Sequence, residues 1–201
     1  MSLLRLFYLS LVSPGLAIFE VERAYQLGYL FLGFLGFTIS QASLLICSSI
    51  IDHSPLYGGT FFIDLCGSVL TGAVQITLMV LIIHVTLSRG VDVTAFPRMM
   101  TTFFLAQIPF SYLVCFSIMG KSMEVFAQNS TMGLTFFLVL SALVFAYVVF
   151  LLGKGIQIHY RAATWVKSFT ILVIALFVTI LMQFVASAGF VLTLIGSLYH
   201  L

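Results

Sequence analysis

Charged residues divide this chain into long apolar stretches, and that division constrains the fold more than any other feature. Asp, Glu, Lys and Arg are absent from residues 24–51, 65–88, 99–120, 125–153 and 168–201. A helix of about 20 apolar residues spans a bilayer, because in hydrocarbon each backbone polar group must bond within its own segment. The sequence therefore predicts an all-α polytopic membrane protein, a five-transmembrane-helix bundle. We place its helices near 26–50, 65–87, 100–119, 132–153 and 169–195.

Composition excludes the soluble classes of protein. Apolar residues make up 62% of the 201 residues and charged residues only 7%, whereas a soluble domain carries about 25% charged residues. Eight Lys and Arg in total cannot form the basic surface of a nucleic-acid-binding protein. We therefore expect the lipid bilayer as the surrounding medium and no nucleic acid as a partner.

The positive charges are distributed unevenly across the predicted connections. The segments expected on one side carry seven of them: Arg5, Arg23, Arg89, Arg98, Lys154, Arg161 and Lys167. The segments expected on the other side carry only Lys121. Because Lys and Arg accumulate on the cytoplasmic side of membrane proteins, we predict a cytoplasmic N-terminus and a C-terminus outside.

The N-terminal segment is apolar but too short to cross a membrane. Residues 2–13 carry one charge, Arg5, and Ser13-Pro14-Gly15 follows. Proline cannot continue a helix, so we expect Pro14 to end a short interfacial helix over 2–13. A cleaved signal or a re-entrant segment is the alternative, although no clear small-residue cleavage site follows.

No known catalytic or metal-binding pattern is visible. The chain lacks the paired aspartates, Ser–His pair or HExxH pattern of intramembrane proteases. Cys47, Cys66 and Cys115 stand in or beside apolar runs without CxxC spacing, which is typical of small residues within a bundle. We therefore predict no catalytic, cofactor or metal site, and a protein that is not an enzyme.

Amide side chains stand near the middle of four predicted spans. They are Gln41, Gln75, Gln107 and Gln183. An amide facing lipid would leave its donors and acceptors unpaired, so we expect all four to point into the bundle. They could act as hydrogen bonds between helices, each worth about 1 kcal/mol. They could instead line a polar path for a small solute or a lipid headgroup.

Two further residues belong to this candidate intramembrane cluster. His84 is the ionisable side chain expected inside the second span, about one turn from its cytoplasmic end, where it could reach the headgroups or relay a proton. Pro109 stands within the third span beside Gln107. It should kink that helix and free a carbonyl near residue 105 for Ser111, a glutamine or water. The kink could hinge or simply shape the bundle.

Two stretches of the sequence carry a family pattern. Residues 3–14 are followed by Phe19, and residues 81–90 lead through Phe96 to a proline in the third span. With five helices and a cytoplasmic N-terminus, this pattern resembles the Yip1 domain family, especially its short bacterial members. The resemblance implies a non-enzymatic protein of the bacterial inner membrane that acts through partners. The family's DLYGP motif and long polar N-terminus are missing, so a Rab GTPase role is not implied.

The resulting hypothesis is a membrane scaffold or interaction subunit that binds other membrane proteins or forms a homo-oligomer. The alternative is a transporter or permease subunit that uses the glutamines and His84 as a polar path at the membrane midplane. A wet groove lined by glutamine would favour transport, whereas an exposed bulky helix face would favour a partner.

Overall fold

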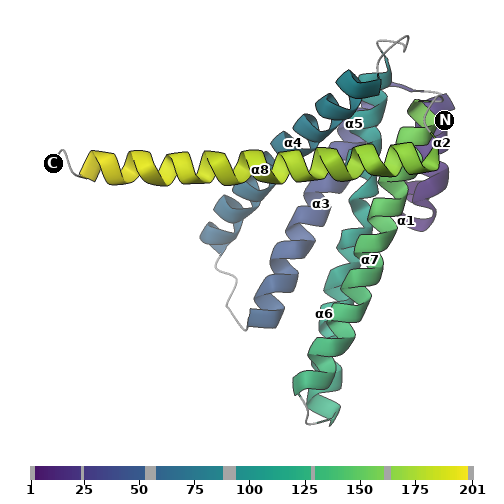
Figure 1. Cartoon of the computed structure of the whole chain (residues 1–201). Helices are drawn as coiled ribbons and strands as arrows, with labels where there is room; N and C mark the ends of the chain where they lie inside the picture. The colour runs from purple at the N-terminus through teal and green to yellow at the C-terminus, as the bar shows by residue number, and fades with distance from the viewer. Residues whose placement is uncertain are drawn as a thin grey trace.

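The structure, a computed structural model, describes residues 3–23, 25–52, 58–87, 94–127, 130–160 and 164–198. Within these ranges the chain is helical, with no strand (Figure 1). The elements are α1 (Leu3–Val12), α2 (Pro14–Arg23), α3 (Leu27–Asp52), α4 (Gly58–Leu87), α5 (Ala95–Ala106), the 3-10 helix η1 (Ile108–Tyr112), α6 (Leu113–Ala127), α7 (Ser130–His159) and α8 (Trp165–Leu198). Among the described residues, five helical segments are long and apolar enough to cross a membrane, which confirms the predicted fold class.

Several helices are longer than the sequence predicted. α4 begins at Gly58 rather than near 65, and α7 continues to His159 rather than ending near 153. The predicted spans end at charged residues, but both Asp64 and Lys154 lie inside helices in the structure. A charged side chain near a helix end can extend to the membrane surface, so it does not have to end the helix.

The N-terminal region forms two helices where the sequence predicted one. α1 ends at Val12, as expected before Pro14, but Pro14 is itself the first residue of α2. Proline suits that position because its missing N–H would have no partner in the first turn. Ala17, Ile18 and Val21 form the buried stripe of α2. The second helix was missed because the proline was interpreted only as a stop.

The third span is interrupted at the predicted proline. η1 joins α5 to α6 around Pro109, and Phe110 N–H bonds to the Gln107 carbonyl at 3.0 Å. The Ser40 hydroxyl on α3 donates a second hydrogen bond to the same carbonyl, at 2.7 Å. The break therefore receives its extra donor from a neighbouring helix. Ser111, one of the three donors considered, bonds instead to the carbonyl of Ile108.

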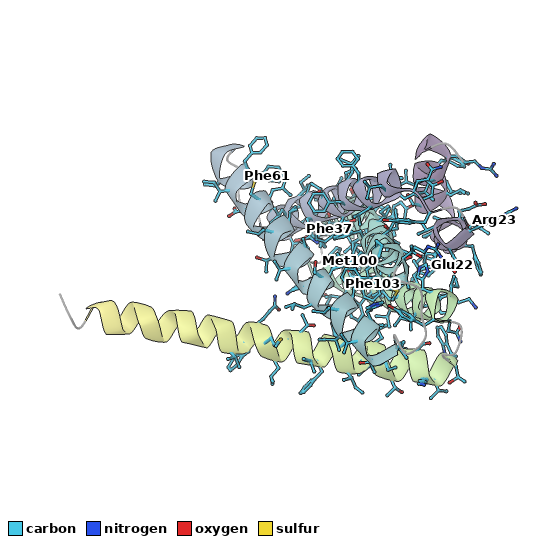
Figure 2. The ribbon with its side chains drawn as sticks, turned by 90° about the horizontal axis from the view of Figure 1, so that it is seen from above. Glu22, Arg23, Phe37, Phe61, Met100 and Phe103 are labelled. Carbon is cyan, nitrogen blue, oxygen red and sulfur yellow. The ribbon has the colours of Figure 1, made fainter. Side chains whose placement is uncertain are left out.

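The broken span lies at the centre of the molecule. Helix α5 contacts α2, α3, α4 and α7, and half of the most apolar part of the span Ala95–Val125 is buried. Met99, Phe103 and Phe104 are core residues, and Phe37 of α3 packs against Phe104 with ring centres 5.3 Å apart. Figure 2 shows Phe37, Met100 and Phe103 within the bundle.

Glycines permit the closest approach between helices α6 and α7. A Cβ on Gly133 of α7 would overlap the backbone oxygen of Gly120 of α6. Small residues let helix backbones approach in lipid, where packing rather than the hydrophobic effect drives association. Gly33 plays the same part on α3, where a Cβ would lie 3.2 Å from the Thr101 carbonyl oxygen of α5.

Helix α8 is attached to the bundle along one narrow stripe. Within residues 165–185, the part of α8 whose side chains are described, the buried residues are Ser168, Ile171, Leu172, Ala175 and Thr179. They recur every three or four positions, as expected for one helix face, and α8 contacts α4 and α7. In both figures α8 runs across the bundle and extends well beyond it toward the C-terminus.

Candidate functional sites in the bundle

Three of the predicted glutamines line one polar cavity. It measures about 360 Å³ and lies between α3, α4 and the break in the third span. Its wall contains Phe37, Gln41, Gly67, Ser68, Thr71, Gly72, Gln75, Ile76 and Gln107. The volume falls within the range of small-molecule sites, about 300–1,000 Å³.

The polar groups of this cavity are only partly satisfied by the chain itself. Ser68 Oγ donates to Gln41 Oε1 at 2.6 Å, which joins α4 to α3. The side chains of Gln75 and Gln107 make no hydrogen bond within the described part of the chain. Both side chains are partly buried, and an amide withdrawn from water costs free energy when it lacks a partner. The cavity can therefore supply hydrogen-bond donors and acceptors to a small polar guest or to water.

The structure does not bring all members of the predicted cluster together. Gln183 lies on α8 beyond Thr179, the last described residue buried there, and makes no hydrogen bond to a described residue. His84 lies near the far end of α4 and is likewise absent from the cavity wall. Depth along a span predicted the level of each side chain but not the direction in which it points.

His84 is instead paired with a tyrosine. Its Nδ1 lies 2.7 Å from the hydroxyl of Tyr160, at the end of α7, and its ring meets Phe96 edge-on at 5.5 Å. Burial raises the pKa of Tyr160 to about 12. The phenol therefore keeps its proton at neutral pH and can donate it in a hydrogen bond to Nδ1 of His84.

A second polar network, missed by the sequence analysis, joins α2, α5 and α7. His159 Nε2 lies 2.7 Å from the hydroxyl of Thr102, and His159 Nδ1 lies 2.7 Å from a carboxylate oxygen of Glu22. The same oxygen lies 3.5 Å from Nη1 of Arg98. The His159 side chain is fully buried, so both ring nitrogens depend on these partners.

The order carboxylate, imidazole, hydroxyl is also found in hydrolytic triads. Here, however, Thr102 is fully buried, and a Cβ on Gly155 would lie 2.5 Å from its methyl carbon. The hydroxyl is enclosed in the contact between α5 and α7. The network is therefore built to fasten the amphipathic α2 to the two core helices.

The sequence did not predict this network, because the predicted fourth span ends at residue 153, before the charge of Lys154. That choice placed His159 in a loop, where no buried partner was expected. The apolar pattern resumes at Gly155-Ile156, and this was the available signal that α7 continues.

Within the described residues, no three His, Cys, Asp or Glu side chains gather to hold a metal ion.

Comparison with protein-family models, with curated proteins and with solved structures finds no match to this chain. The geometry of the helices and of their polar groups is therefore the basis for the functional proposals below.

Proposed function

We propose that this chain is a non-enzymatic membrane subunit of Yip1-like type that works by associating with a second membrane protein or another copy of itself. The observation that carries the proposal is the packing of α8. Phe177, Ile180 and Phe184 are all more than half exposed, and the amide of Gln183 lacks a partner within the described chain. Lipid can cover the apolar side chains, but it cannot satisfy the amide within the hydrocarbon layer.

The proposed orientation has the N-terminus in the cytoplasm and the C-terminus outside, in a bacterial inner membrane. The support is the seven-to-one distribution of Lys and Arg. α1, α2, the start of α5 and the end of α7 are gathered at one end of the bundle (Figure 1). These elements carry Arg5, Arg23, Arg98 and Lys154. Labelling of Ser2→Cys and Leu201→Cys by a membrane-impermeant maleimide should reveal opposite sides; labelling from the same side contradicts the orientation.

Cross-linking in native membranes tests the association directly. In a background without the three native cysteines, Phe184→Cys on α8 should give a cross-linked dimer or an adduct with another protein. Phe62→Cys is the matched control, because Phe62 is an equally apolar, exposed side chain on α4. Cross-linking of Phe184→Cys no stronger than that of the control would contradict the proposal.

The glutamine-lined cavity supports a second candidate, a permease subunit for a small solute or a lipid. In proteoliposomes, urea-driven swelling or the flipping of a fluorescent phospholipid should then depend on Gln75 and Gln107. Gln75→Leu and Gln107→Leu should abolish the flux, whereas Thr77→Val should preserve it, because the Thr77 hydroxyl faces away and bonds within α4. Full flux in both glutamine variants would exclude this candidate.

A further inference from the structure

A second cavity, with charged walls, lies beside the amphipathic helix α2. It measures about 490 Å³ and is lined by Phe19, Glu20, Glu22, Arg23 and Arg98. Four of its five lining residues come from α2, and the fifth comes from the first turns of α5. Figure 2 shows Glu22 and Arg23 together at the edge of the bundle, on α2.

The charges in this cavity are incompletely matched by one another. Glu22 is engaged by His159 at 2.7 Å and by Arg98 at the longer distance of 3.5 Å. The Arg98 Nε is buried and has no hydrogen-bond partner. Glu20 and Arg23 form no ion pair or hydrogen bond with any described residue. The guanidinium of Arg23 and the carboxylate of Glu20 therefore remain available in this cavity, beside the partly exposed side chain of Arg98.

Positive guanidinium groups and negative carboxylates in one cavity favour a ligand that carries both a negative and a positive charge. Guanidinium groups bind phosphate through several directed hydrogen bonds, and a carboxylate accepts hydrogen bonds from a primary ammonium. A purely anionic group would satisfy Arg23 and Arg98 but would lie against Glu20 and Glu22. A phosphate linked to an ammonium satisfies both sets.

The surroundings of the cavity favour a lipid as the source of that group. Leu16 and Phe19 are half exposed on α2, while the opposite stripe of this helix is buried against the bundle. A short helix with this pattern lies at the boundary between headgroups and acyl chains. We propose that the cavity binds the headgroup of a phosphatidylethanolamine-like lipid, with phosphate on Arg23 and Arg98 and ammonium on Glu20.

Native mass spectrometry of the full chain, released from vesicles with equal phosphatidylethanolamine, phosphatidylglycerol and phosphatidylcholine, tests the proposal. The wild-type chain should retain phosphatidylethanolamine about fivefold over each other lipid, a ratio typical of one partly exposed charge contact. Glu20→Gln should remove this preference, and Arg23→Gln should reduce the retention of all three lipids. Neither residue has a partner in the described chain, so both variants should fold normally.

Asp64→Asn is the matched control, because Asp64 is an exposed carboxylate on α4, and it should keep the wild-type preference. Equal retention of the three lipids by the wild-type chain would overturn the proposal, as would an unchanged preference in Glu20→Gln. Soluble phosphoethanolamine at millimolar concentration should leave the bound lipid in place; its binding without any lipid preference would identify a free metabolite instead and overturn the assignment. The outcome does not depend on whether α8 associates.

Discussion

The α2–α5–α7 end of the molecule and the segment 180–185 of α8 differ in whether their polar side chains find partners within the chain. At the first, His159 is fully buried and both its ring nitrogens have partners from other helices. On the second, Gln183 is partly exposed, lacks a partner in the described chain and stands among exposed apolar side chains.

The difference shows which polar side chains have their partners within a single chain and which do not. Both ring nitrogens of His159 have partners within the chain, so α2, α5 and α7 should keep their arrangement whatever else is bound. The segment 180–185 of α8 has no buried side chain and no partner for the amide of Gln183 within the described chain. Its stable arrangement should therefore depend on a second protein.

Removal of the central imidazole should have the largest effect. His159→Leu leaves the buried hydroxyl of Thr102 and the carboxylate of Glu22 without their shared partner, and should lower the free energy of unfolding by about 2 kcal/mol. Thermal unfolding in mild detergent measures the loss. Thr170→Val is the control, because Thr170 is an exposed side chain that bonds within α8. If the two variants unfold at the same temperature, the network does not hold the helices together.

Removal of the donor at the proline break should have a smaller effect. Ser40→Ala deprives the Gln107 carbonyl of its donor from α3, and should cost about 1 kcal/mol, as is typical of hydrogen bonds between membrane helices. Ser43→Ala is closely matched, since Ser43 lies on the same helix but bonds to its own Ile39 carbonyl at 2.9 Å. Unfolding in detergent should distinguish the two; equal stability would show that the break needs no support from α3.

Replacement of the unpaired amide should affect association without affecting the isolated chain. Gln183→Leu should weaken the complex about fivefold, because a single interhelical hydrogen bond is worth about 1 kcal/mol. Met182→Leu, at the preceding position of α8, should leave the affinity unchanged. Energy transfer between labelled chains in vesicles measures association. Unchanged or tighter association of Gln183→Leu would contradict a hydrogen bond from this amide across the interface.

The contact between His84 and Tyr160 should contribute least at neutral pH. Because burial raises the pKa of Tyr160 from 10 to about 12, its stabilising effect is complete below pH 10 and is lost as the pH rises through 12. Tyr160→Phe should flatten this alkaline loss of stability, whereas Tyr147→Phe, an exposed position on the same helix, should not. An identical alkaline profile for Tyr160→Phe would contradict the assignment.

The sequence predicted the features that depend on the chain's own chemistry. The uncharged stretches predicted five spans, because a helix that crosses a bilayer must be apolar over about 20 residues. Pro109 predicted a break in the third span, because proline has no N–H to donate to the helix. The partners of polar groups were harder to predict, because they depend on how each helix is rotated. Gln41, Gln75 and Gln107 line one cavity, whereas Gln183, to which the same argument applies, lies apart from it. His159 was missed once Lys154 was taken as a boundary.

The most direct test of the claim that α8 is incomplete in a single chain is the mass of the particle in its own membrane. Native mass spectrometry of polymer-bounded lipid discs, taken from the producing cells without detergent, gives that mass. We predict a particle that contains the 22.2 kDa chain together with a second copy or another membrane protein. A folded particle with one copy of the chain and lipid alone would contradict the account.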